Sequence, residues 1–276
     1  MKKSQKLHGL CFSVSNWPVK KEDYLPQLKR IAPHVEWVRT YNNTMPEFGL
    51  EAHKLGLKVA AGAVLERTRN RRNRREVERL IREANAGHVD LAIIGNESIF
   101  DLMKERGERG VPPAIHIRYI EKFRRSCPHV PVTTAQDAKH LIKNPKVMAA
   151  CDVVAMHSYP YWEHVSIENA VTELARIYGL VKTMVGDKEV LITETGWPSR
   201  GQSNGPAVAS VENAIRYARE VAAGQMPLAS KSGILRHATS LGKLNLKASW
   251  AGTGVTGPSM ASRKSVSNNL ALFGNT

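Results

Sequence analysis

Cysteines, long apolar runs and acidic residues are all scarce in this chain of 276 residues. The three cysteines, Cys11, Cys127 and Cys151, form no CxxC pair, and their odd number argues against a disulfide framework, so we expect buried thiols. No run reaches the ~18 apolar residues of a membrane span, and no apolar core follows the basic residues 1–6. The sequence therefore predicts no membrane helix and no secretory signal. As written, it predicts a cytoplasmic protein.

Acidic residues are outnumbered, because 40 Lys and Arg against 25 Asp and Glu give a formal charge of +15. Such a surface attracts phosphate, so a basic nucleic-acid-binding protein is a distant alternative. Six arginines crowd residues 67–75, but this stretch runs into Glu76, Glu78 and Glu83 with apolar residues at helical spacing. No aromatic residues suited to base stacking accompany the arginines. The pattern favours the solvated start of a helix, and we expect no nucleic-acid partner.

Short apolar strands alternate with amphipathic helical stretches from the start of the chain to about residue 222. The expected strands are residues 10–15, 35–41, 58–64, 91–97, 131–135, 152–157 and 190–194. The expected helices are residues 22–31, 47–55, 74–85, 114–126, 137–150, 167–181 and 211–222. Because parallel neighbours need a crossover, this alternation predicts a parallel sheet. Residues 1–223 therefore form one α/β domain with seven strand–helix units.

Residues 224–276 have a different character. They contain no Asp or Glu and six Lys or Arg, and their Ser, Gly and Thr follow neither a helical nor a strand period. Such sequence is typical of a disordered or irregular segment. We expect a basic tail where an eighth strand–helix unit would stand.

Two of the expected strands end in a carboxylate. The apolar residues 91–95 and Asn96 precede Glu97, and residues 191–193 precede Glu194, which is followed by a sharp turn into Trp197. Barrel enzymes place catalytic groups at the carboxyl ends of their strands. Two acids delivered to one face suit glycoside hydrolysis, in which one protonates the leaving oxygen and the other attacks or activates water.

The segments around both acids resemble glycoside hydrolase family 17, the β-1,3-glucanases and glucanosyltransferases, and in particular its bacterial branch. The resemblance covers most of residues 8–222 and is carried by residues 9–13, 38–41, 94–97, 159–162 and 193–199. It implies a (β/α)8 TIM-barrel fold, with the acid/base after the fourth strand and the nucleophile at the end of the seventh. Both positions agree with the strands counted from the sequence.

The resemblance also implies the chemistry. Glu194 would be the nucleophile and Glu97 the general acid/base of a retaining mechanism on β-1,3-glucan, with no metal and no cofactor. Retention needs carboxyl groups about 5 to 5.5 Å apart, with Glu97 protonated near neutral pH. Asn96 would bond the sugar 2-hydroxyl. Transglycosylation and an inactive glucan-binding remnant are the alternatives, and the oligomeric state is left open.

Five further residues are candidates for binding the substrate. Tyr159, Trp162 and Trp197 would line the cleft, because flat aromatic faces suit the apolar C–H patches of sugar rings. Rim packing is the alternative for the first two, and a structural plug under the nucleophile is the alternative for Trp197. Tyr41 would face the substrate from the second strand. His157 is either a hydrogen-bonding group of the site or a core histidine.

The chain departs from the family after the seventh helix. Relatives continue with an eighth strand reading like Phe-Glu-Ala-Phe-Asp-Glu-Pro-Trp-Lys, which supplies an acid and a lysine to the site. Permitted codons for residues 234–243, read in a shifted frame, give Phe-Glu-Ala-Cys-Asp-Glu-Pro-Trp-Lys, so we hypothesise a frameshift between residues 217 and 233. Seven strands would leave the first and seventh with unpaired edges, so we expect an unstable product of low activity.

Overall fold

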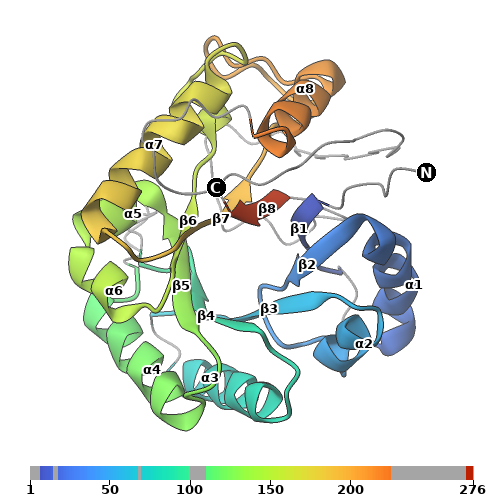
Figure 1. The fold of residues 1–276 in the computed structure, drawn as a ribbon, viewed down its shortest axis with the longest axis vertical. Helices are drawn as coiled ribbons and strands as arrows, with labels where there is room; N and C mark the ends of the chain where they lie inside the picture. Colours follow the sequence, from blue (N-terminus) through green and yellow to red (C-terminus); the bar gives the residue numbers. More distant parts are fainter. Residues whose placement is uncertain (1–6, 15–17, 68–69, 100–109, 225–271, 276) are drawn as a thin grey trace.

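The computed structural model describes residues 7–14, 18–67, 70–99, 110–224 and 272–275, and shows a closed barrel of strands surrounded by helices (Figure 1). The strands are β1 Leu7–Cys11, β2 Val35–Arg39, β3 Lys58–Ala63, β4 Leu91–Asn96, β5 Val132–Asp137, β6 Val154–His157, β7 Val190–Thr195 and β8 Leu272–Asn275. Neighbours from β1 to β7 are parallel. The predicted (β/α)8-type barrel is confirmed.

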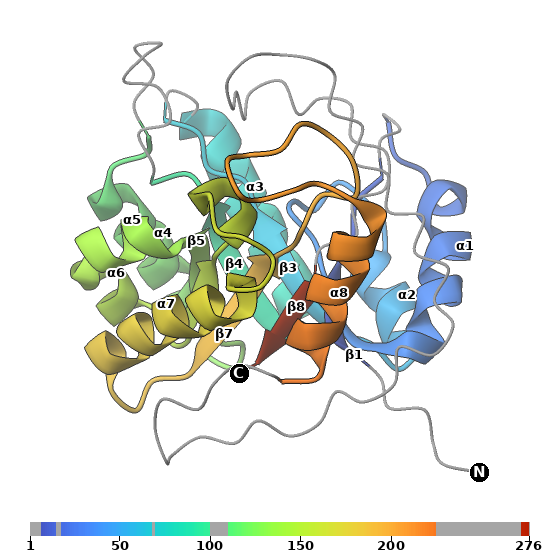
Figure 2. The same cartoon turned by 90° about the horizontal axis from the view of Figure 1, so that it is seen from above.

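The helices cover the outside of the barrel (Figure 2). They are α1 Lys21–Ile31, α2 Phe48–Lys54, α3 Asn70–Asn85, α4 Pro113–Ser126, α5 Ala138–Lys143, α6 Pro145–Ala150, α7 Ala170–Val185 and α8 Val211–Ala222, with short 3-10 helices η1 Ala32–His34 and η2 Pro160–Glu163. The single helix expected over residues 137–150 is two helices, because Pro145 lacks the N–H that would continue the first and begins the second. No helix in the described ranges is long and apolar enough to cross a membrane.

Helix ends follow the sequence in part. The Ser210 side chain accepts a hydrogen bond from the backbone N–H three residues later, at 3.0 Å, and caps α8. The glycines after α2 and α3, Gly56 and Gly87, adopt left-handed φ values of 73° and 75°. The helix expected from residue 167 begins only at Ala170, as α7.

The sheet is packed on both faces, which explains why its strands are almost continuously apolar. Alternate residues of the strands point outward into apolar clusters shared with the helices. The other set meets inside the barrel as a small cluster made by Ala60, Leu91, Ile93, Ala135, Ala155 and Leu191. Register shifts follow Ile93 in β4 and Met156 in β6, toward the carboxyl ends of the strands. Such irregularities redirect side chains, and here they lie directly before the candidate site.

The eighth position of the barrel is filled by β8, which is antiparallel to both of its neighbours. Its backbone pairs with Gly9 and Leu10 of β1 and with Leu191, Ile192 and Thr195 of β7. The expectation that β1 and β7 keep unpaired edges is therefore wrong at these positions.

The parallel eighth strand of the family, and the helix that would follow it, have no counterpart in the described residues. The predicted tail lies largely outside the described residues, and residues 234–243 lie wholly outside them. The frameshift hypothesis and the prediction of disorder therefore stay predictions.

Candidate active site

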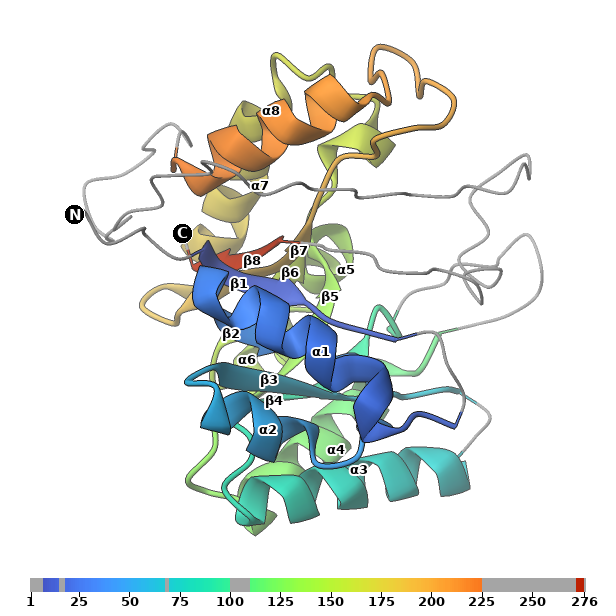
Figure 3. The same cartoon turned by 90° about the vertical axis from the view of Figure 1, so that its right-hand side faces the viewer.

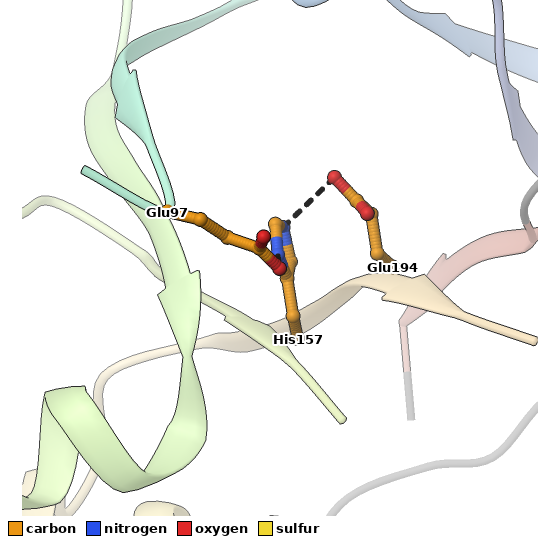
Figure 4. Close-up of side chains that lie close together, drawn as sticks. All are labelled: Glu97, His157 and Glu194. Atoms are coloured by element: carbon orange, nitrogen blue, oxygen red, sulfur yellow. Dashed lines mark hydrogen bonds and ion pairs between the residues drawn. The ribbon is translucent and has the colours of Figure 1, made fainter. Parts of the chain in front are cut away.

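Glu97 and Glu194 converge at the carboxyl ends of β4 and β7, with His157 of β6 between them (Figure 4). One carboxylate oxygen of each acid and one ring nitrogen of His157 all lie within 4.8 Å of one another. Carboxyl groups of retaining glycosidases stand about 5 to 5.5 Å apart, whereas inverting enzymes need roughly 6.5 to 9.5 Å to admit a water molecule. The spacing fits direct attack on a sugar carbon.

Glu194 is a buried carboxylate that three neighbours keep ionised. Arg39 Nη1 lies 2.7 Å from its Oε1, and the Tyr159 hydroxyl donates to its Oε2 at 2.6 Å. Burial is the largest influence on its pKa and raises it, but the charges of His157 and Arg39 and the hydrogen bonds from Tyr159 and Arg39 together lower the pKa to about 2. An ionised and firmly held carboxylate is what a nucleophile requires.

Arg39 is the functional residue that the sequence reading missed. It ends β2 fully buried, and besides Glu194 it donates to the Thr193 carbonyl at 2.9 Å and to the Asn96 side-chain oxygen. A buried cation is tolerated only when it is paired, so these contacts explain both its position and that of Asn96. The available signal was an arginine at the end of an apolar strand, inside the motif at residues 38–41.

Glu97 is presented by a strained turn directly after β4. Its φ is 44° and that of Gly95 is 81°, so the backbone turns sharply within three residues. The Glu97 N–H donates to the Ala135 carbonyl of β5 at 2.8 Å. The next residue, Ser98, places its hydroxyl 2.8 Å from Nε2 of His116 on α4. These bonds fix the turn and hold the carboxylate over the barrel mouth.

His116 anchors that turn from below. It is fully buried, and burial lowers its pKa to about 4, so its ring is neutral near neutral pH. Its Nδ1 lies 3.4 Å from the Pro112 carbonyl, which can only accept, so Nδ1 carries the proton and Nε2 accepts from the Ser98 hydroxyl. A side chain at Gly95 would clash with both groups, since its Cβ would lie 2.6 Å from Ser98 Oγ and 2.9 Å from His116 Nε2.

His157 links the two acids. It is fully buried, and its Nδ1 lies 2.9 Å from Glu97 Oε1. Its Nε2 lies 3.4 Å from Glu194 Oε1, without hydrogen-bond geometry to any described group. Of the two interpretations of His157, the structure favours the hydrogen-bonding group. The three side chains are also of types that ligate transition metals, but the Arg39 guanidinium already occupies Glu194 and would repel a metal cation.

The predicted aromatic residues divide between site and core. Tyr159 contacts Glu194 as described, and the half-buried ring of Tyr41 stacks under the Arg39 guanidinium, 5.0 Å from ring centroid to Cζ. Trp162 lies on η2 with 38% of its surface exposed, edge-to-face against Tyr161 at 4.9 Å. Contact of Trp162 with a sugar ring stays a prediction.

Trp197 belongs to the core. Only 8% of its surface is exposed, and its indole N–H donates to the Val208 carbonyl at 2.9 Å. Its ring packs edge-to-face on Tyr161 at 5.3 Å and contacts Tyr217 at 5.7 Å. The interior already holds its apolar faces and its polar atom, so its contact with the substrate stays a prediction. The structural plug is the interpretation that the packing supports.

A parallel barrel that carries two carboxylates at this spacing on the carboxyl ends of β4 and β7 has the architecture of the barrel glycoside hydrolases. A family model for the BtgE/BtgC glycoside hydrolase domain matches residues 9–232. The chain belongs to this family. The match covers the strands that carry both acids.

Named relatives agree with this family. The chain is 34% identical over 145 residues to a probable glucan endo-1,3-β-glucosidase of Aspergillus niger, covering 46% of this chain and 31% of the relative. It is 29% identical over 131 residues to a probable family 17 glucosidase of Saccharomyces cerevisiae, covering 45% and 32%. The matched region thus spans about a third of the length of these relatives. The resemblance to glycoside hydrolase family 17 is confirmed, while its bacterial branch stays a prediction.

Solved structures agree as well. A glycoside hydrolase family 17 β-1,3-glucanosyltransferase from Rhizomucor miehei superimposes with a TM-score of 0.64 and 26% identity, over 79% of this chain and 82% of that one. An active-site mutant of the same enzyme, with the same scores, is in complex with laminaritriose.

Proposed function

We propose that the chain is a retaining glycoside hydrolase that acts on β-1,3-glucan. The observation that carries the proposal is the approach of Glu97 and Glu194, whose carboxylate oxygens lie within 4.8 Å across the barrel mouth. Membership of a glycoside hydrolase family and the β-1,3-glucan activities named for its relatives support the substrate.

The proposed reaction has two steps. Protonated Glu97 gives its proton to the glycosidic oxygen while the Glu194 carboxylate attacks the anomeric carbon, which breaks the glycosidic bond and forms a glycosyl-enzyme ester. Glu97, now ionised, takes a proton from water, and that water releases the sugar with its original configuration. His157 holds Glu97 through its Nδ1, and Arg39 and Tyr159 hold Glu194 in its charged form.

Three residues bind the sugar in this proposal. The Asn96 side-chain oxygen is occupied by Arg39, so its NH2 group remains to donate to the 2-hydroxyl beside the bond that is cut. Trp162, and the exposed part of Tyr159, offer ring surface at the rim. Tyr41 acts indirectly, because its ring packs against the Arg39 guanidinium that holds the nucleophile.

Transglycosylation is the second candidate, because the same glycosyl-enzyme can be captured by a sugar hydroxyl instead of water. The solved relative named a glucanosyltransferase is the observation that favours it. Products longer than the substrate, accumulating at high laminari-oligosaccharide concentration, would identify the transferase. An inactive glucan-binding remnant would instead bind these oligosaccharides without cleaving them.

The test follows anomeric proton signals by NMR while purified protein cleaves laminari-oligosaccharides. We expect the β-anomer to form first and Glu194→Gln to abolish cleavage. Glu121→Gln, which removes an exposed carboxylate on α4, is the matched control and should keep full activity. An α-anomer formed first would contradict retention, and full activity of Glu194→Gln would reject the site.

A further inference from the structure

The outer wall of the barrel carries a cationic groove that the proposed reaction does not use. It lies between α3 and α4, which run side by side (Figures 1 and 3). The groove is an open hollow of about 470 Å³, and its lining residues are Asn70, Arg74, Arg118, Tyr119, Lys122 and Arg125. Four of these six side chains are positively charged. The groove therefore joins the arginine-rich start of α3 to a second set of cations about fifty residues later in the sequence.

Most of these charges have no acidic partner. Lys122 pairs with Glu78 at 3.3 Å. Arg74, Arg118 and Arg125 are exposed and make no ion pair with any residue of the described ranges. Like charges gathered in one concave surface repel one another, and an anion placed between them relieves that repulsion. Guanidinium groups bind carboxylate, sulfate and phosphate oxygens through paired hydrogen bonds.

The shape and lining of the groove indicate which kind of anionic ligand it could bind. Nucleic-acid grooves offer exposed aromatic rings for base stacking, but Tyr119, the aromatic lining residue, is only 7% exposed. The groove is a trough between two helices, a shape that suits an extended chain better than a flat membrane surface. A linear polymer with one anionic group on each unit can lie along the groove and present charges to successive arginines.

The connectivity of the barrel places one end of the groove near the active site. α3 follows β3 and α4 follows β4, so both helices begin at the end of the barrel where Glu97 and Glu194 lie. We propose that the α3–α4 groove binds an acidic polysaccharide, whose carboxylate or sulfate groups pair with Arg74, Arg118 and Arg125. This site is separate from the cleft proposed for neutral glucan.

The test measures binding of fluorescently labelled oligogalacturonate by anisotropy at about 150 mM salt, where weak surface attraction is screened. The double variant Arg118→Gln/Arg125→Gln removes two unpaired groove charges. The matched control, Lys29→Gln/Arg30→Gln, removes two exposed charges from α1. We expect the groove variant to weaken binding about tenfold, and the control less than about twofold. Thermal unfolding of both variants verifies that they remain folded.

Three outcomes would overturn the proposal. They are equal weakening in both double variants, tighter groove-dependent binding of single-stranded DNA, and tighter groove-dependent binding of anionic lipid vesicles. Neutral laminari-oligosaccharide should not compete with oligogalacturonate for the groove. The measurements are repeated in Glu194→Gln, because binding should persist there. Loss of the groove interaction can thus be told apart from failure of the proposed glycosidase activity.

Discussion

Replacing Arg39 with methionine should raise the pKa of Glu194 and destabilise the barrel. The substitution keeps a long side chain in a fully buried position but removes the cation that lies 2.7 Å from Glu194 Oε1. In the intact protein the pKa of Glu194 falls from 4.5 to about 2, although burial opposes ionisation. That difference corresponds to roughly 3 kcal/mol in favour of the ionised form, shared among Arg39, His157 and Tyr159. Breaking a buried ion pair typically costs about 3 to 5 kcal/mol, so a loss of this order is expected.

The pH dependence gives the sign of the effect. A carboxyl group with a lowered folded-state pKa contributes stability that is fully present above its unfolded pKa and is lost as the pH falls toward the folded value. For Glu194 this window runs from about 4.5 down to about 2. Without Arg39, burial is opposed only by His157 and Tyr159, so the window should shrink. The acidic limb of kcat/KM should move to higher pH.

Urea unfolding from pH 7 to pH 3 and a pH profile of aryl β-glucoside hydrolysis measure both effects. Arg30→Met, at an exposed position of α1, is the control and should change neither. Arg39→Lys retains the positive charge, so its stability and its acidic limb should lie between those of Arg39→Met and Arg30→Met. If Arg39→Met unfolds like the intact protein and its acidic limb stays in place, the ion pair does not set the state of the nucleophile.

Further predictions concern the acid/base and its turn. Glu97→Ala should slow glucan cleavage by about 10²- to 10⁴-fold but spare the cleavage of aryl glucosides with good leaving groups. Added azide should restore turnover and give a glycosyl azide as the product. Equal loss of activity on both substrates would argue against an acid role for Glu97. Ser98→Ala removes the hydrogen bond to His116, so it should show the same leaving-group dependence more weakly and lower the free energy of unfolding by about 1 kcal/mol. If the activity on both substrates is unchanged, the hydrogen bond has only a structural role. Gly95→Ala places a Cβ at a φ of 81°, 2.6 Å from Ser98 Oγ and 2.9 Å from His116 Nε2, so it should lower the stability of the protein by at least about 1 to 3 kcal/mol in thermal unfolding. An unchanged stability would mean that the turn can relax.

The placement of both acids was predictable because its causes are local. An apolar strand that ends on an acid can be recognised within a few residues, and parallel topology brings such ends to one rim. Arg39 was not predictable in this way, since its partner Glu194 lies 155 residues away. The sequence shows an arginine at the end of a strand, and only the closed barrel shows that this arginine is buried against a carboxylate.

The two possible roles of Trp197 and the α3–α4 groove could not be read from the sequence for a related reason. An aromatic residue after a catalytic strand fits a sugar platform and a core plug equally well, and only the packing against Tyr161 and the bond to Val208 separate the two. In the sequence Arg74 fits a solvated helix face, and only the fold shows that it shares a groove with the cations of α4. Contacts between elements that are distant in sequence decide both cases.

Closure of the barrel and support of the active site are separate tasks of an eighth unit, and β8 performs only the first. Its four residues give β1 and β7 backbone partners, which lowers the cost of open edges. It is antiparallel, and residues 272–275 are Leu-Phe-Gly-Asn, so this strand brings neither the acid nor the lysine that the family resemblance implies there. We therefore expect cooperative unfolding near that of an intact barrel together with reduced glucan turnover. Non-cooperative unfolding, measured on the same preparation as the turnover, would show that closure by β8 is insufficient.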